Sequence, residues 1–142
     1  MVERIEFNKK ELAIILRSQY KENGIHFFTS DDAPQQLAHM KRDKNYIIEP
    51  HVHHSVERKI SLTQEVLLIK SGIVRVDFYS DKKIYIESRA LYKGDVILLM
   101  SGGHGFKMLE DSEIIEIKQG PYVAGKDKER FATVLEDKVT IL

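Results

Sequence analysis

Four of the six histidines in this sequence lie in two short stretches, with a glutamate between them. If Asn45–His53 forms a strand, His51 and His53 point to the same face, because side chains alternate along a strand. His104 follows a glycine turn, and Glu65 opens an apolar strand, where a carboxylate is costly to bury unless it is paired or coordinated. Three imidazoles and one carboxylate suit a divalent first-row metal ion such as Fe, Mn, Ni, Co or Zn.

The same residues also permit interpretations without this metal set. Two histidines at i, i+2 can be an ordinary polar strand face, and Glu65 could pair with Arg58 or Lys59. Those two cations could instead hold an anionic group. A third neighbouring histidine, His54, leaves open whether it replaces His51 or His53 as a ligand.

The elements that must position these residues are predicted to be one short helix followed by many strands. Asn8 and Glu11 have the spacing of a helix N-cap, and the apolar stripe from Leu12 to Tyr20 predicts a helix over about 9–22. From residue 25 onward, short runs of Val, Ile, Tyr and Phe alternate with turn residues, which indicates a sandwich or barrel. The predicted strands are 25–29, 36–42, 45–53, 65–70, 73–79, 83–91, 95–100, 104–109 and 113–118. After Pro121 we expect a polar extension with a short helix at 126–131 and a last strand at 139–142.

The motifs on these strands resemble those of the cupin family. His51-Val52-His53 resembles the first half of the first cupin motif, and Glu65 followed by six residues and Gly72 resembles its second half. Gly94–Leu99 with Ser101–His104 resembles the second motif. The runs 101–106, 108–111 and 118–122 are similar to a subgroup of small uncharacterised bacterial and archaeal cupins.

The sequence departs from the cupin pattern at three points. The segment 55–64 is an insertion between the histidine pair and Glu65, which we expect to form a loop or an added hairpin. His104 falls one residue early, and Met100 stands where the motif has proline. Met108 replaces the final asparagine of the motif.

The resemblance implies the fold and the metal ligands. It implies one all-β domain over 1–142, a double-stranded β-helix (cupin or jelly-roll barrel) with a short N-terminal helix. The helix would cover about 9–22, the barrel about 25–122 and a C-terminal extension 123–142. The metal ligands implied are His51, His53, Glu65 and His104. A homodimer is also expected, from the resemblance and from the amount of apolar surface.

The strand 113–118 offers two candidate catalytic residues. Ile115 and Ile117 share one face, which we expect to be buried either in the barrel or in a dimer contact, and Glu116 and Lys118 share the other. With the apolar face in a dimer contact, Glu116 and Lys118 would point into the pocket and act on a substrate. Otherwise they form a solvated face.

Three functions are compatible with these residues. The first is a metalloenzyme acting on a small polar substrate such as a sugar or a hydroxy or keto acid, either isomerase-like, epimerase-like or oxygenase-like. The second is a non-catalytic cupin that binds a small ligand such as a sugar. The third is a structural cupin with an empty site, because a fold alone does not determine function.

Composition narrows the partners and the chemistry. The 142 residues contain 22 Lys and Arg and 22 Asp and Glu, so the formal net charge is zero. This balance argues against nucleic acid and against a polybasic membrane contact. The absence of cysteine excludes thiolate ligands. The charged N-terminal residues do not resemble a secretory signal, which predicts a cytoplasmic protein with a small-molecule ligand and a second copy of itself as partners.

Overall fold

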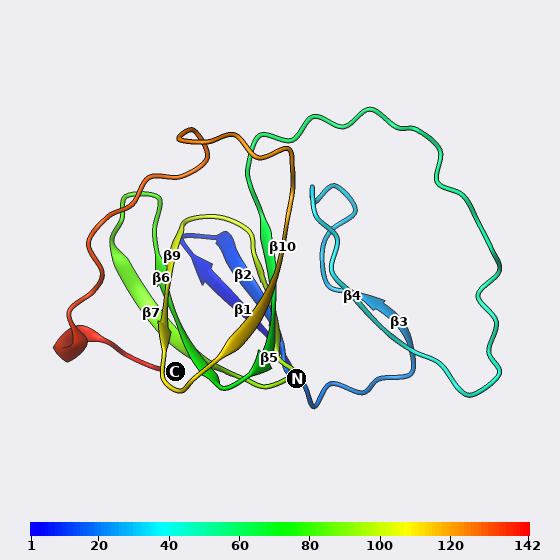
Figure 1. Cartoon of the computed structure of the whole chain (residues 1–142), viewed down its shortest axis with the longest axis horizontal. Coiled ribbons are helices and arrows are strands. Elements are labelled where there is room, and N and C mark those ends of the chain that lie inside the picture. Colours follow the sequence, from blue (N-terminus) through cyan, green and yellow to red (C-terminus); the bar gives the residue numbers. More distant parts are fainter. The chain divides into compact units, whose positions relative to one another are not determined.

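The computed structural model describes all residues 1–142 and shows an all-β protein with antiparallel sheets and no α-helix (Figure 1). The chain divides into two compact units, which are the main unit (Met1–Tyr20 with Leu62–Leu142) and the 21–61 unit (Lys21–Ser61). The strands of the main unit are β1 (Val2–Phe7), β2 (Lys10–Leu16), β5 (Glu65–Ser71), β6 (Ile73–Tyr79), β7 (Tyr85–Tyr92), β8 (Val96–Leu99), β9 (Gly103–Met108) and β10 (Glu113–Lys118). No helix has the length and apolarity that crossing a membrane requires.

Two sheets form the main unit. One has five strands in the order β1-β2-β8-β5-β10, and the other has three strands in the order β7-β6-β9. Side chains from both sheets form a single hydrophobic core, as expected when each sheet buries one face. The core residues are Ile5, Leu12, Ala13, Ile15, Leu67, Ile69, Val74, Val76, Phe78, Leu91, Ile97 and Leu99.

The strand pairings in the main unit are nested. β5 and β6 follow one another along the chain, as do β9 and β10, and β5 pairs with β10 while β6 pairs with β9. Gly72, at the turn between β5 and β6, has a φ of +80°. A Cβ at this position would collide with Ser112 and with the backbone of Asp111, so only glycine fits. The nesting leaves β9 and β10 each at a free edge of its sheet.

The predicted helix over 9–22 is wrong, because Lys10–Leu16 is the strand β2. Asn8 and Lys9 have φ values of 51° and 62° and form the two-residue turn of the β1–β2 hairpin, so Asn8 is a turn residue and not a helix cap. The apolar residues from Leu12 to Leu16 are all buried, so both faces of β2 are covered, and β1 and β8 flank the strand within the sheet. When apolar residues follow one another without a break, their spacing does not distinguish a helix from a strand that is buried on both faces.

The 21–61 unit contains a small antiparallel hairpin of β3 (Gly24–Phe27) and β4 (Ala38–Lys41). Gln36 stabilises the connection, because the Thr29 hydroxyl donates to its Oε1 over 2.7 Å and the backbone of Leu37 donates to the Thr29 hydroxyl over 3.2 Å. The predicted strand 45–53 is not formed, and the segment from 42 to 64 contains no strand. A strand needs a partner for its backbone groups, and sequence alternation alone does not supply one.

Residues 131–142, here called the C-terminal strap, run along the outer face of the three-stranded sheet in the main unit (Figure 1). The Ser88 N–H donates to the Thr140 carbonyl over 2.8 Å, and the Thr140 N–H donates to the Tyr85 hydroxyl over 2.8 Å. The expected strand 139–142 is reduced to one parallel bridge, between Ser88 and Ile141. The expected helix at 126–131 is absent, and a single 3-10 turn, η1 (Glu136–Lys138), lies further along the strap.

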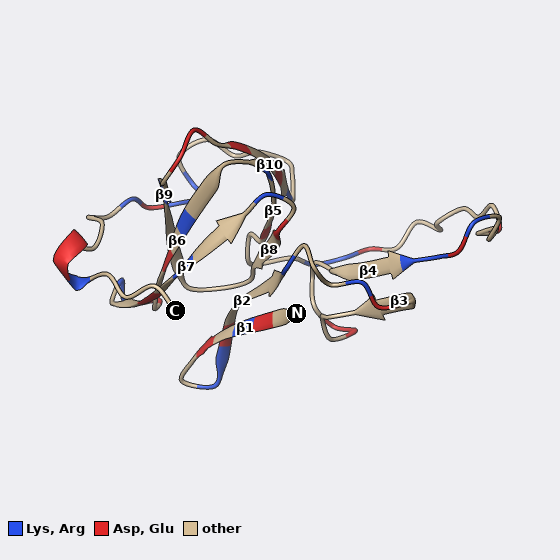
Figure 2. Cartoon of the chain, turned by 90° about the horizontal axis from the view of Figure 1, so that it is seen from below, with Lys and Arg blue, Asp and Glu red and all other residues tan.

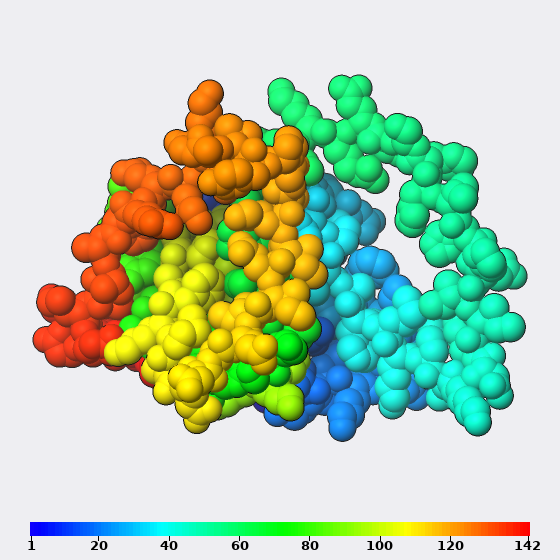
Figure 3. Space-filling model, in the orientation of Figure 1, coloured from blue at the N-terminus to red at the C-terminus, as the bar shows by residue number.

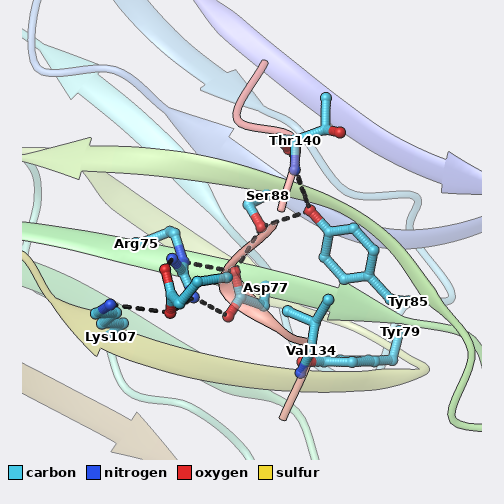
Figure 4. Close-up of polar contacts among 9 residues, drawn as sticks. Arg75, Asp77, Tyr79, Tyr85, Ser88, Lys107, Val134 and Thr140 are labelled. Carbon is cyan, nitrogen blue, oxygen red and sulfur yellow. Dashed lines mark hydrogen bonds and ion pairs between the residues drawn. The ribbon is translucent and has the colours of Figure 1, made fainter. Parts of the chain in front are cut away.

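The strap covers a buried ion pair of the sheet (Figure 4). Arg75 and Asp77 are neighbours on the outer face of β6, with exposed fractions of only 3% and 2%. Arg75 donates from Nε and Nη2 to the Asp77 carboxylate over 2.8 and 3.0 Å, and Ser88 donates to the same carboxylate. Glu136 of the acidic η1 turn (red in Figure 2) accepts from the remaining donors of Arg75 over 2.9 and 3.2 Å, and Lys107 adds a contact of 2.9 Å.

The Glu136 contact makes the strap sensitive to acid. Hydrogen bonds from Arg75 and Lys107 lower the pKa of Glu136 from 4.5 to about 2. Because the folded pKa is depressed, the stabilising contribution of Glu136 is complete above pH 4.5 and is lost as the pH falls towards 2. Urea unfolding of the wild type and of Glu136→Gln is therefore expected to differ at pH 7 and to converge as the pH falls through this range. An equal difference at pH 7 and pH 2.5 would contradict the assignment.

Candidate functional site

The main unit brings two of the predicted metal ligands into contact. Glu65 is the first residue of β5, and His104 is the second residue of β9. His104 Nε2 lies 3.3 Å from Glu65 Oε2, and both side chains are partly buried. The contact joins the five-stranded sheet to the three-stranded sheet at one end of the core.

The two predicted catalytic residues lie on β10 beside this contact. Lys118 is directly opposite Glu65 in the β5–β10 ladder, and Glu116 is opposite the core residue Leu67. Because directly opposite residues of an antiparallel pair share a face, both β10 side chains lie on the inner face of the sheet. Lys118 Nζ lies 3.8 Å from Glu65 Oε1 and 3.5 Å from Glu116 Oε1.

These contacts fix the charge state of two groups. The hydrogen bond from His104 is the main cause that lowers the pKa of Glu65, with smaller contributions from the charges of Lys118 and Lys128, and burial opposes them. The carboxylate of Glu116, followed by that of Glu65, raises the pKa of Lys118. At neutral pH the cluster therefore holds an ionised Glu65 carboxylate and a Lys118 ammonium.

Ile115 and Ile117 are not buried inside the main unit, so the first of their two predicted positions, the barrel interior, is wrong. They lie opposite Leu68 and Val66 in the ladder, on the outer face of β10, with exposed fractions of 45% and 56%. β10 is an edge strand, so no further strand of its sheet shields them. Their position on the outer face agrees with the alternative in which the charged residues of β10 point inward.

The other predicted metal ligands, His51 and His53, belong to the 21–61 unit. Their rings are in edge-to-face contact with centroids 5.2 Å apart, although the segment forms no strand. The ring of His51 also makes a 2.9 Å hydrogen bond from Nδ1 with the backbone carbonyl of Glu49. His54 follows them and is exposed.

The spacing of Glu65 and His104 is that of a His–Glu ion pair, and it is also compatible with two ligands of one metal ion. Two ligand atoms that each lie ~2.1 Å from one metal ion are separated by ~3.0–3.4 Å in tetrahedral or octahedral geometry. The 3.3 Å between His104 Nε2 and Glu65 Oε2 lies within this range. No group of three or more histidine, aspartate or glutamate side chains in the chain lies close enough together to hold an ion. Glu65–His104 in the main unit and His51–His53 in the 21–61 unit are two separate pairs.

Two glutamines beside the site, Gln64 (buried) and Gln119 (partly buried), were not identified from the sequence. Gln64 precedes Glu65, Gln119 follows Lys118, and the backbone N–H of Gln64 donates to Gln119 Oε1 over 2.7 Å. The atoms Gln64 Oε1 and Gln119 Nε2 are buried and have no protein partner. Buried polar atoms usually have one, so the pair offers an acceptor and a donor next to the site. The sequence alone does not show that Gln64 and Gln119 are neighbours. Their proximity follows from the strand register, in which Glu65 is paired with Lys118.

No family model matches the chain, and searches of curated proteins and of solved structures find no match either. The fold and the geometry of the site define an all-β protein of antiparallel sheets with a Glu–His–Lys cluster at one end of its core.

Proposed function

We propose that this protein binds a divalent first-row metal ion (Fe, Mn, Ni, Co or Zn) and acts on a small polar substrate such as a sugar or a hydroxy or keto acid. The observation that carries the proposal is the 3.3 Å approach of His104 Nε2 to Glu65 Oε2, from strands of two different sheets. His51 and His53 stay proposed ligands on the strength of the sequence motif alone.

The finer fold assignment belongs to the same proposal. We infer a cupin-type jelly-roll barrel, which folds antiparallel strands into two sheets by Greek-key connections. The nested pairing of β5 with β10 and of β6 with β9 supports it, because wrapping one long hairpin produces this nesting. The cupin-like motif at Glu65–Gly72 falls on β5 and its turn to β6, and the one at Gly94–His104 falls on β8 and the start of β9.

The chemistry follows from the charge states of the cluster. A divalent ion bound to Glu65 and His104 would act as a Lewis acid towards a carbonyl or hydroxyl oxygen of the substrate. Lys118, protonated at neutral pH, can donate a proton to an oxygen that gains negative charge. The Glu116 carboxylate, half exposed beside Lys118, can accept a proton from carbon. This pair supports isomerisation or epimerisation, in which one proton leaves a carbon atom and one returns.

Metal analysis of the purified full-length chain tests the proposal. The metal-free protein would be dialysed separately against Fe(II), Mn, Ni, Co and Zn, and the bound element measured. We expect about one ion per chain for at least one metal. Retention of none of the five metals would overturn the proposal.

Two histidine variants test the ligands of the 21–61 unit. We expect His53→Ala to lose most of the bound metal and His54→Ala to retain it, so the neighbouring residue serves as a matched control. The reverse result would show that the histidine pair is wrongly assigned.

We further propose a homodimer in which a second copy covers the outer face of β10. The half-exposed Ile115 and Ile117 support this, and a chain of zero net charge does not repel its copy. Light scattering is expected to give twice the chain mass, whereas a mass of 16.5 kDa would contradict the dimer.

A further inference from the structure

The segment from residue 41 to residue 63 is exposed throughout, although it carries seven large apolar side chains. The most exposed of them is Val52, at 81%. The seven residues are Tyr46, Ile47, Ile48, Val52, Val56, Ile60 and Leu62. In Figure 3 the turquoise atoms of this segment form a narrow arm. A long exposed stretch with this many apolar side chains is typical of an interaction site.

The backbone of the same segment lacks strand pairing. Between residues 47 and 63 no backbone group bonds to another backbone group. Two carbonyls of the segment contact its own side chains, since His51 makes a 2.9 Å hydrogen bond with the Glu49 carbonyl and Arg58 donates to the Val56 carbonyl over 3.4 Å. A free sheet edge would satisfy the remaining backbone groups of the alternating run 45–53.

The free edge of β10 is such an edge, and the register of β5 shows which of its backbone groups are available. The Ile69 N–H donates to the Asp95 carbonyl over 3.0 Å, so the backbone of Ile69 points to the β8 side. Backbone groups alternate in direction along a strand, so Leu68 points to β10, where it is opposite Ile115. β10 therefore directs the backbone groups of Ile115 to β5. By the same alternation, the backbone groups at the free edge belong to Ile114, Glu116 and Lys118.

Proline at position 50 sets the matching direction in the run 45–53. Pro50 has no N–H, so it fits an added edge strand where its nitrogen faces away from the ladder. Its neighbours Glu49 and His51 then direct their backbone groups towards the ladder. These two residues are therefore the ones that can pair with the backbone groups left free on β10.

One antiparallel register combines these directions with complementary side chains. Placing Glu49 opposite Lys118 gives an ion pair, and it also places the His51 imidazole opposite the Glu116 carboxylate. The apolar side chains then meet on the other face of the sheet. The pairs in this register are Glu49–Lys118, Pro50–Ile117, His51–Glu116, Val52–Ile115 and His53–Ile114.

We propose that residues 49–53 of a second copy of this chain add to the free edge of β10 as an antiparallel strand. The added strand and the free edge belong to the same chain, so two copies related by a twofold axis can exchange their strands reciprocally. The inference rests on the homodimer proposed above, for which it names the contacting segment, and it requires no bound metal ion. It also adds Glu49 and His51 of the second copy to the face of β10 that carries Lys118.

Cross-linking of two full-length single-cysteine variants tests the strand addition, since the chain has no cysteine. Val52 and Ile115 would form a non-hydrogen-bonded pair, in which the Cβ atoms lie close enough for a disulfide. Co-expressed Val52→Cys and Ile115→Cys should therefore form a covalent dimer on mild oxidation, whereas either variant alone should not. Val56→Cys with Ile115→Cys is the matched control and should remain unlinked, because Val56 is an exposed valine of the same segment outside the paired residues.

A charge reversal tests the register. Glu49→Lys places a positive charge opposite Lys118, so the dissociation constant of the dimer should rise about tenfold or more. Glu57→Lys makes the same change of charge at an exposed residue outside the pairs and should leave the constant unchanged. Light scattering over a dilution series measures both.

Equal cross-linking of Val52→Cys and Val56→Cys with Ile115→Cys, no cross-link in either mixture, or an equal effect of the two lysine variants would overturn the inference. If the wild type is a dimer in those cases, the proposed homodimer stands and another segment makes its contact. A wild-type mass of 16.5 kDa would contradict the homodimer itself.

Discussion

Replacing His104 by alanine is expected to lower the affinity for a divalent metal ion by about a hundredfold or more. Changes in residues that merely orient metal ligands typically cost 10–100-fold, so loss of a direct ligand should cost at least as much. The imidazole Nε2 lies 3.3 Å from Glu65 Oε2, so its removal leaves the carboxylate as the single donor of the main-unit pair. Competition with a chromophoric chelator would measure the change.

Two further variants complete this test. Glu65→Gln keeps the shape of the side chain and removes its charge, so it should weaken metal binding through the second donor of the pair. His26→Ala removes a partly buried histidine of β3 whose ring makes a 2.8 Å hydrogen bond with the backbone carbonyl of Asn23, and it should leave the affinity unchanged. Wild-type affinity in His104→Ala, or an equal loss in His26→Ala, would contradict the assignment.

Replacing Asp77 by alanine is expected to reduce the free energy of unfolding by about 3 kcal/mol. Breaking a buried ion pair by removing one partner typically costs ~3–5 kcal/mol, because the other charge stays buried without compensation. Glu136 still contacts Arg75 in the variant, which favours the lower end of that range. Ser88 would also lose the acceptor of its hydroxyl group. Urea unfolding at pH 7 would give the difference.

Asp81→Ala is the control for this change. Asp81 forms an ion pair with Lys10 over 2.7 Å, but both side chains are largely exposed, and such pairs contribute at most ~1 kcal/mol. A double variant, Arg75→Met with Asp77→Leu, should lose less stability than Asp77→Ala, because no unpaired charge is left behind. Equal losses in Asp77→Ala and Asp81→Ala would show that burial of the Arg75–Asp77 pair does not matter.

The sequence predicted the strands of the main unit best where turn residues separate short apolar runs. Ile73–Tyr79 and Glu113–Lys118 begin and end where predicted, since Gly72, Ser80 and Ser112 mark their boundaries. Prediction failed where a run has no alternation, as in β2, or where alternation exists without a partner, as in 45–53. The strand β1 was missed because its charged residues Glu3, Arg4 and Glu6 do not resemble a buried strand.

The sequence predicted the residues of the candidate site better than the directions in which their side chains point. Residue types and motif spacing singled out Glu65 and His104, and the structure brings them together. The alternation along 113–118 puts Glu116 and Lys118 on one face and Ile115 and Ile117 on the other. It does not say which of the two faces points inward. Opposite residues in the ladder decide it, since Glu116 lies across from the core residue Leu67.

The nested ladders also determine when the site forms during folding. Glu65 pairs with Lys118, and Phe78 with His104, so the cluster exists only after segments far apart in the sequence have met. Chains dominated by such non-local contacts fold slowly, on the order of milliseconds to seconds. Glu65 and His104, the proposed main-unit ligands, come together only after these ladders have formed, so under the metal-binding proposal metal capture should follow closure of the β5–β10 ladder. The rate at which an added ion is bound during refolding would then report the last step of assembly.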